Sequence, residues 1–253
     1  MEIDRRNNIY KVTRRGFIVV ALAGVAELIY LKERSHQLPK FVPIFVRPSQ
    51  VLDLTTWKIN LPIRNQQVTQ PDLSAFYDDA FKVVQAVQFT VMCDGQAQPG
   101  SAYPRSELRE MNADGSQASW STTSGVHRMD LTQRITHLPV VKPQLVCGQI
   151  HSDTEYLILV EVDNNRLYVR YKDDVAGVLD KDYQLGTYFN MMIQAAQGYV
   201  DVFYNGAHMV HQPLNANGCY FKAGCYLQSN TSRGDQPTAY GQVEICKLAI
   251  SHS

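Results

Sequence analysis

The sequence predicts an all-β fold, a sandwich or jelly roll, and three observations support this prediction. Short β-prone runs with alternating apolar residues follow one another from about residue 51 to the C-terminus, separated by glycine and asparagine turns. Beyond residue 50 the only candidate helix is short, at residues 71–80. The length of 253 residues, 45% of them hydrophobic, suits one large β domain whose core needs no disulfide or metal.

Two hairpins carry the most specific turn signals. Residues 157–162 and 166–172 flank the turn-forming string Asp163-Asn164-Asn165, which joins two β-rich runs. Residues 199–204 precede Asn205-Gly206, the strongest short hairpin signal, and a further run follows it. We therefore expect neighbouring antiparallel strands in both regions.

The charge balance excludes one class of function. The chain carries 24 Lys and Arg against 24 Asp and Glu, so its formal net charge is +0. A bulk nucleic-acid binder usually has a basic excess, and we expect no nucleic-acid partner here. Neutrality overall still permits a local basic cleft for an anionic ligand.

The first fifty residues differ from the rest of the chain. Basic residues precede an apolar run from Gly16 to Leu31 that only Glu27 interrupts. A spanning helix needs about 20 apolar residues, so this shorter run is more typical of an export signal. The string TRRGFI at 13–18 resembles a twin-arginine signal. An uncleaved anchor and an ordinary amphipathic helix are the alternatives.

These features divide the chain into three parts. We expect residues 1–31 to be a signal or anchor, residues 32–50 a linker with three prolines, and residues 51–253 the folded domain. The protein is then secreted or periplasmic, with a membrane-anchored form as the alternative.

The cysteines and most histidines give no sign of a metal or cofactor. Five cysteines lack C-x-x-C spacing, and we expect each to be a small buried hydrophobe. No metal-ligand spacing connects the histidines at 127, 137, 208, 211 and 252, which we expect to be ordinary surface or core residues. We expect no metal and no other cofactor.

Three segments place polar chemistry on one face of a strand, because residues two apart in a strand share a face. In the string RSELR at 105–109, Arg105, Glu107 and Arg109 point one way and Leu108 the other. A carboxylate between two arginines can orient both guanidinium groups by charge-assisted hydrogen bonds.

The other two segments repeat this pattern. In QIH at 149–151, Gln149 and His151 share a face, and Ile150 points to the core. In YFKAGCYLQ at 220–228 the polar face consists of Tyr220, Lys222, Tyr226 and Gln228. The opposite face of that strand is entirely apolar. A solvated polar face is the alternative for any one strand, but three strands with Arg, His, Gln and Tyr predict a cationic groove.

These three ordered strings resemble the signature segments of polysaccharide lyase family 7, the alginate lyases. LTTWKINLP at 54–62 also resembles the opening strand of that family, so the similarity covers roughly residues 52–253. One departure is Leu227, where the family often has Asn; its side chain should face the core. The resemblance implies a β-jelly roll with a concave substrate groove, and metal-independent β-elimination of a polyuronate.

The resemblance also implies roles for individual residues. Arg105, Gln149 and His151 would neutralise the uronate carboxylate, and Tyr226 would be the catalytic acid and base. For the epimer of opposite C5 configuration, His151 would be the base and Tyr226 the acid. The substrate-binding residues would be Glu107, Arg109, Lys222 and Gln228, with Glu107 holding the arginines in place. The partner is thus an anionic polysaccharide, alginate, and we expect a monomer.

Three alternatives follow from the same residues. Isoleucine between Gln149 and His151 is associated in the family with guluronate-containing blocks, but a lyase acting on glucuronan would show the same strand motifs. A non-catalytic carbohydrate-binding jelly roll is the second alternative, although such a protein would have no need for both His151 and Tyr226. A glycoside hydrolase needs two carboxylates, for which Glu161 and Asp163 are the best candidates, and a third expected acid is Asn165.

Overall fold

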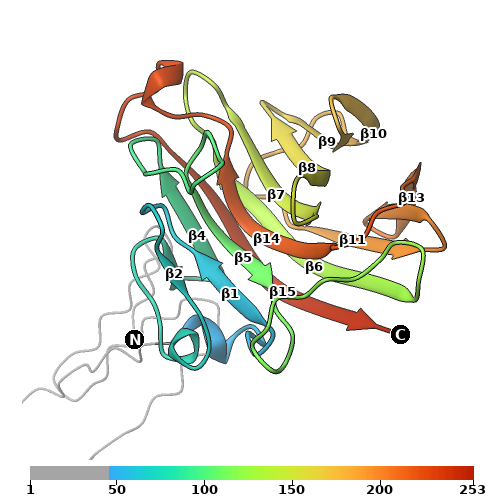
Figure 1. Ribbon diagram of the computed structural model, residues 1–253. Helices are drawn as coiled ribbons and strands as arrows, with labels where there is room; N and C mark the ends of the chain where they lie inside the picture. Colours follow the sequence, from blue (N-terminus) through green and yellow to red (C-terminus); the bar gives the residue numbers. More distant parts are fainter. Residues whose placement is uncertain (1–45) are drawn as a thin grey trace, which may run out of the picture. The chain divides into compact units, whose positions relative to one another are not determined.

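The computed structural model describes residues 46–253, and this part of the chain forms a β-sandwich of two antiparallel sheets (Figure 1). The predicted signal or anchor and most of the predicted linker, up to residue 45, lie outside the described residues. Among residues 46–253 there is no helix long and apolar enough to cross a membrane.

The first sheet, sheet A, has eight strands in the order β10-β9-β8-β7-β14-β5-β1-β2. In that order their bounds are β10 (Asp174–Asp180), β9 (Arg166–Tyr171), β8 (Tyr156–Asp163), β7 (Gln144–His151), β14 (Tyr220–Leu227), β5 (Arg105–Glu110), β1 (Trp57–Asn60) and β2 (Gln67–Val68).

The second sheet, sheet B, has seven strands in the order β13-β12-β11-β6-β15-β4-β3. Their bounds are β13 (Ala207–Pro213), β12 (Tyr199–Tyr204), β11 (Phe189–Ala196), β6 (Val126–His137), β15 (Tyr240–His252), β4 (Val87–Met92) and β3 (Phe81–Val83). Three 3₁₀ turns complete the described elements, η1 (Pro48–Gln50), η2 (Asp72–Ser74) and η3 (Thr231–Arg233).

The last two strands enter the middle of the sandwich. Strand β14 inserts between β7 and β5 in sheet A, and β15 inserts between β6 and β4 in sheet B. This crossover, which is that of a jelly roll, brings three distant segments of the sequence side by side (Figure 1). The predicted all-β jelly roll is therefore confirmed.

The turn signals placed the hairpins correctly, whereas the helix prediction was wrong. Strands β8 and β9 pair around Asn164-Asn165, and β12 and β13 pair around Asn205-Gly206. Within residues 71–80 only the single 3₁₀ turn η2 forms. Leu73 of this turn is fully buried in the core, and Asp78 then bridges to Phe81. The helix does not extend past this one turn, because the following residues form a β-bridge instead.

The core lies between the two sheets and uses the apolar faces that alternation predicts. Leu108 and Ile150 are fully buried, as are the four apolar residues of β14, Phe221, Ala223, Cys225 and Leu227. Leu227 does face the core, so the departure from the family pattern at this position is away from the groove. Burial of these apolar side chains is the main favourable contribution to folding.

The cysteines follow the expectation at four of five positions. Cys93, Cys147, Cys219 and Cys225 are buried and free, whereas Cys246 is free and exposed. The exception has a local cause. A register shift between Ile245 and Lys247 makes a bulge in β15, so Cys246 is turned outward together with Lys247.

Gly224 occupies a position in β14 that only glycine tolerates. Its φ is +137°, and β14 carries one extra residue opposite β7 between Ala223 and Tyr226. A Cβ atom here would lie 2.7 Å from the carbonyl oxygen of Ser106 and 3.0 Å from Cα of Glu107. The missing side chain therefore lets β14 and β5 approach at the point where both carry groove residues.

We expect Gly224→Ala to destabilise the protein by about 2–5 kcal/mol, because backbone strain at positive φ (about 1–3 kcal/mol) adds to overpacking (about 1–3 kcal/mol). The control is Gly115→Ala, since Gly115 has a φ of +82° but no atom within 4 Å of the added Cβ. Urea denaturation followed by circular dichroism measures both. Equal losses in the two variants would contradict a steric role for Gly224.

Candidate active site

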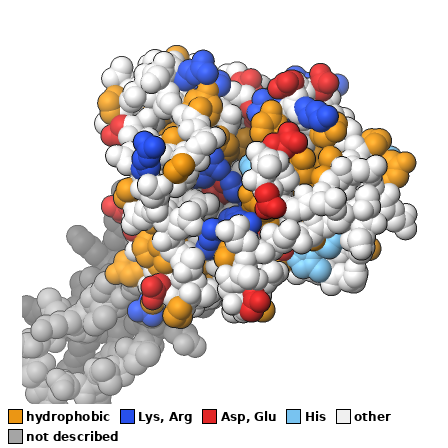
Figure 2. Space-filling view, in the orientation of Figure 1, with side chains coloured by type: hydrophobic (Ala, Val, Ile, Leu, Met, Phe, Trp, Pro, Cys, Tyr) orange, Lys and Arg blue, Asp and Glu red, His pale blue; other side chains and the backbone are white. Residues whose placement is uncertain are grey.

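The strand register alone places the predicted site residues on the outer face of sheet A. It pairs Tyr220 with His151, Lys222 with both Gln149 and Arg109, and Tyr226 with Arg105. Figure 2 looks onto this face and shows Lys and Arg side chains gathered in a recess. The predicted cationic groove is thus present over the central strands β7, β14, β5 and β1.

A buried carboxylate, that of Glu107, is the centre of this cluster. Glu107 is 1% exposed, and its Oε2 lies 2.5 Å from Nζ of Lys222 and 3.3 Å from Nη1 of Arg105. Its Oε1 accepts a hydrogen bond from the side-chain amide of Gln149. Burial acts to raise the pKa of Glu107, but the charges of Lys222 and Arg105 outweigh burial and hold this pKa below its usual value. Glu107 is therefore ionised.

Lys222 is the cation most affected by burial. Its side chain is 5% exposed, and desolvation lowers its pKa to about 8 despite the opposing effect of Glu107. The nearby charges of Arg105 and Arg109 act in the same direction as burial. Lys222 thus carries a positive charge at neutral pH that it can lose in mildly alkaline solution.

Arg105 connects this cluster to the phenol of Tyr226. Its guanidinium carbon lies 3.8 Å from the ring centroid of Tyr226, a cation–π contact. Its Nη2 donates to Oγ of Ser101 at 2.6 Å, and that hydroxyl lies 3.1 Å from the Tyr226 hydroxyl. Both the ring and the hydroxyl of Tyr226 are therefore held in place by neighbours.

Within the described part of the chain, His151 leaves one ring nitrogen free on the groove face. Its Nδ1 hydrogen-bonds the carbonyl oxygen of Ser152, which can only accept, so Nδ1 carries the proton. In the neutral ring Nε2 then bears the lone pair, and it has no hydrogen-bond partner among residues 46–253. Burial lowers the pKa of His151 below 6.5, and the charges of Lys222 and Arg105 act in the same direction. The ring also stacks on Tyr220 at 5.4 Å between centroids.

Arg109 is placed differently from the sequence expectation. Its guanidinium donates to the carbonyl oxygen of Glu110 at 2.6 Å and to Oε1 of Gln117 at 2.8 Å. It also covers the ring of Tyr220 at 3.9 Å. The expectation that Glu107 holds both arginines was therefore wrong, because of the two arginines Glu107 pairs with Arg105 alone. Position i+2 on the same strand face did not bring Arg109 within reach, since closer acceptors satisfy it.

Gln228 lies just beyond the end of β14 and is largely buried, at 8% exposed. Its side-chain amide donates to the carbonyl oxygen of Leu227, and its backbone N–H donates to that of Gln144. It thus lies at the end of the groove that Tyr226 occupies.

Sequence reasoning missed three members of the site. Ser101 lies in a loop, where no alternation pattern operates. Tyr220 was recognised on the polar face of its strand but was given no role. Lys58, on β1, pairs in register with Arg109, and burial and the charge of Arg109 lower its pKa. Lys58 lies in the string that resembles the family's opening strand, and this position was the available signal.

A shallow depression continues from this site along a loop. Arg64 and residues 96–101 line it, its volume is about 420 Å³, and it ends at Ser101 beside Tyr226. Within residues 46–253, three His, Cys, Asp or Glu side chains that could hold a metal ion do not meet in the groove. The group of this kind in that part of the chain lies on sheet B.

The candidate residues for a hydrolase do not form a pair across the groove. Glu161 is fully buried, accepts from Gln144 and pairs with Arg170 at 3.1 Å. Burial raises its pKa. Asp163 lies at the hairpin turn and accepts from the neighbouring Asn164 side chain. A flanking pair of carboxylates, which glycoside hydrolysis requires, is therefore not formed by these two residues.

A jelly roll with cations, an imidazole and a phenol in a groove on one sheet has the architecture of a carbohydrate-active protein. Comparison with known proteins identifies its family. The model of the family described as alginate lyase matches residues 52–252. The chain belongs to this family, and it is an enzyme of the alginate lyase type.

Solved structures of alginate lyases resemble this chain closely. Alginate lyase AlgAT5 from polysaccharide lyase family 7 is 46% identical with a TM-score of 0.81, over 82% of this chain and 99% of that one. An alginate lyase from Corynebacterium sp. is 39% identical with a TM-score of 0.79, over 82% and 98%. Alginate lyase A1-II′, of the same family, is 26% identical with a TM-score of 0.72, over 82% and 99%. A search of the curated proteins gave no match.

We expect Glu107→Gln to cost about 3–5 kcal/mol of stability, because it leaves two buried cations without their counter-charge. The pKa of Lys222 should also fall further below about 8, since Glu107 is the group that raises it. Urea denaturation at neutral pH tests the stability, with Glu155→Gln as an exposed control. A loss no larger than that of the control would show that Glu107 does not organise the cluster.

Proposed function

We propose that this protein cleaves alginate by β-elimination and leaves 4,5-unsaturated uronate ends. The observation that carries the proposal is the Glu107 cluster. It holds cations and an amide on the groove face, with a neutral imidazole and a positioned phenol on the neighbouring strands. The family membership of the chain supports the same reaction.

The chemistry of elimination explains why such residues are needed. The C5–H proton of a uronate is removed, a C4=C5 double bond forms, the C4–O4 bond breaks and O4 is protonated. The C5 proton is barely acidic while the adjacent carboxylate is ionised. Positive charge and hydrogen-bond donors at that carboxylate stabilise the enolate-like charge that develops in the transition state.

We assign this role to Arg105 and Gln149, and to His151 only when its Nε2 carries a proton, because its Nδ1–H is already donated to Ser152. Glu107 holds the first two in fixed positions before substrate arrives, so little reorganisation is needed during the reaction. Lys222 keeps the net charge of the cluster positive, since Arg105 and Lys222 together outweigh the single carboxylate.

Proton transfer falls to Tyr226 and His151. In a syn elimination Tyr226 would take the C5 proton and return a proton to O4. For the epimer of opposite C5 configuration, Nε2 of His151 would be the base and Tyr226 the acid. The tautomer set by Ser152 leaves Nε2 able to accept a proton.

The remaining groove residues would bind the flanking uronates. Lys222 and Gln228 border the reacting centre. Arg109 would add positive charge, and its hydrogen bonds to Glu110 and Gln117 fix the position of its guanidinium group. Arg64 in the loop depression beside Ser101 would supply a cation for a more distant uronate. The preferred substrate we propose is alginate rich in guluronate. Because Ile150 is fully buried, it would influence this preference only through the backbone of Gln149 and His151.

We further propose that the protein is exported and works as a monomer. The basic residues and apolar run at residues 1–31 support export, and a polymeric substrate is most accessible outside the cell.

We expect Tyr226→Phe to lower kcat by about 10²–10⁴-fold, the usual contribution of acid–base catalysis, while polymer binding is kept. The assay follows ultraviolet absorbance of the unsaturated ends, using the full chain with chelator and separate poly-guluronate, poly-mannuronate and glucuronan. Tyr188→Phe, at an exposed tyrosine next to sheet B, is the control.

The substrates separate the competing functions. Faster cleavage of poly-guluronate than of poly-mannuronate supports the proposed preference, and the reverse order would refute it. Cleavage of glucuronan alone would keep the mechanism and change the substrate. Binding without new absorbance on any polymer would identify a carbohydrate-binding module, and near-normal turnover by Tyr226→Phe would remove that residue from the mechanism.

The pKa shifts predict the pH profile of kcat/KM on poly-guluronate, which reports groups of the free enzyme. His151 must be neutral to act as a base, and its lowered pKa puts the acid limb below pH 6.5. Lys222 loses its charge near its pKa of about 8, so activity should fall above about pH 8. Arginine stays protonated, so Lys222→Arg should shift the alkaline limb upward. An alkaline limb that stays in place would show that another group controls it.

A further inference from the structure

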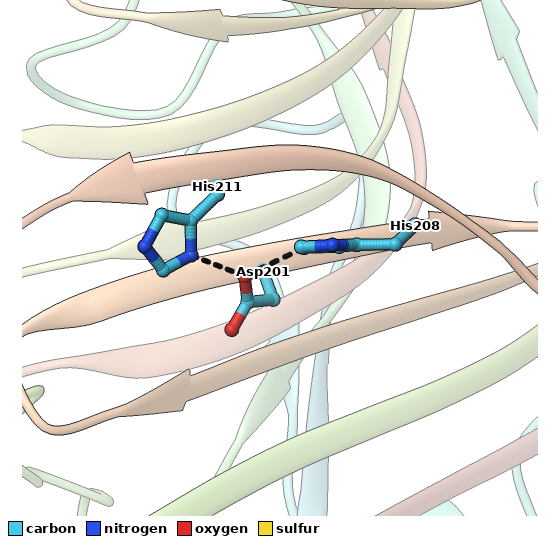
Figure 3. A group of neighbouring side chains, drawn as sticks. All are labelled: Asp201, His208 and His211. Atoms are coloured by element: carbon cyan, nitrogen blue, oxygen red, sulfur yellow. Dashed lines mark hydrogen bonds and ion pairs between the residues drawn. The ribbon is translucent and has the colours of Figure 1, made fainter.

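Three side chains converge on the outer face of sheet B, the sheet that does not carry the groove. Oδ1 of Asp201 on β12 lies 2.7 Å from Nε2 of His208 and 2.7 Å from Nδ1 of His211, both on β13 (Figure 3). The three potential ligand atoms all lie within 4.8 Å of one another. Within residues 46–253, the ion pairs of Asp201 are those with these two histidines.

A bulge in β13 brings the two histidines to the same face. Residues three apart on a regular strand point to opposite faces. Here Val202 pairs with Val210 but Phe203 pairs with His208, so Met209 is an extra residue. The bulge restores the parity, and His211 lies directly opposite Asp201. This is why the spacing of the histidines in the sequence gave no sign of a site.

Aromatic neighbours fix both imidazole rings. His211 stacks on Tyr199 with centroids 4.4 Å apart and planes at 14°. His208 stacks on Phe203 with centroids 4.7 Å apart and planes at 25°. Both histidine rings of β13 are thus held against aromatic rings of β12, on either side of Asp201. Little side-chain freedom remains to be lost when a ligand binds.

We propose that Asp201, His208 and His211 form a binding site for a transition-metal ion of the Zn²⁺ class. Two imidazole nitrogens and one carboxylate oxygen suit Zn²⁺, Cu²⁺ or Ni²⁺, whereas Ca²⁺ and Mg²⁺ prefer oxygen ligands throughout. Metal–ligand distances of about 2.0–2.2 Å in a tetrahedral site place ligand atoms about 3.3 Å apart. The histidine nitrogens need to retreat from Asp201 by about half an ångström, and the two nitrogens, which lie within 4.8 Å of each other, need to adopt the same spacing.

Binding requires one rearrangement of protons. The ring nitrogens that face Asp201 must offer lone pairs, so their protons move to the outer nitrogens of the rings. The histidine side chains are 47% and 56% exposed, and the outer nitrogens can donate to solvent. Three protein ligands leave a fourth position for water.

A metal ion at this site would link the edge strand of sheet B to its neighbour. Strand β13 is the last strand of sheet B and pairs only with β12 in that sheet. An ion bound across the two strands would oppose separation of this edge. Alginate cleavage would not depend on it, because the groove residues lie on sheet A.

The test is calorimetric titration of the chelator-treated full chain with ZnCl₂. We expect one equivalent of Zn²⁺ to bind, and affinity to fall more than about a hundredfold in His208→Gln and in His211→Gln, since loss of even an outer-shell partner costs about 10–100-fold. His137→Gln, at an exposed histidine of sheet B outside the cluster, should bind as the unmodified protein does. Zinc should raise Tm only in the proteins that bind it.

Two further measurements keep the assignment specific. Co²⁺ in the same site should show no thiolate charge-transfer absorption, which excludes the exposed Cys246 as a ligand. CaCl₂ should not displace the zinc. Absence of saturable zinc binding, or unchanged binding in both histidine variants, would overturn the proposal. Circular dichroism confirms that the variants are folded, and their alginate cleavage should be unchanged.

Discussion

The buried carboxylate of Glu107 is the interaction on which the groove depends. It neutralises part of the charge of Arg105 and Lys222 and accepts a hydrogen bond from Gln149, so that residues of β5, β14 and β7 share one acceptor. A buried cation is costly unless it is paired. With one carboxylate between two cations, the cluster stays net positive and yet compact.

This arrangement also fixes the positions of Tyr226 and Ser101, which contact Arg105. Arg105 is held by Glu107, and it in turn lies over the ring of Tyr226 and donates to Ser101. Lys222 and Arg105 also act on the pKa of His151, which burial lowers. The groove thus offers fixed positive charge, a neutral imidazole and a phenol before any substrate is present, which is the preorganisation that the proposed elimination requires.

Three of the bulges in the described strands redirect the side chains discussed above. One in β14 needs Gly224 and lets this strand lie close to Glu107. One in β15 turns Cys246 outward. One in β13 brings His208 and His211 to the same face as Asp201. Bulges redirect side chains at defined points, and here two of the three serve a cluster of polar groups.

The sequence by itself determined the β fold, the hairpins and the inward or outward direction of most side chains in β5, β7 and β14. These features are local, because alternation and turn chemistry act over a few residues. The core positions of Leu108, Ile150 and Leu227 follow directly from this period of two.

Only the tertiary structure decided which groups meet. The segments at 105–110, 144–151 and 220–227 become neighbours through the insertion of β14, and a pairing between distant segments has no local signal. For the same reason Ser101 in its loop, the satisfaction of Arg109 by Gln117, and the Asp201 cluster could not be predicted. Register and bulges depend on the partner strand, and one extra residue reverses the face of every side chain that follows.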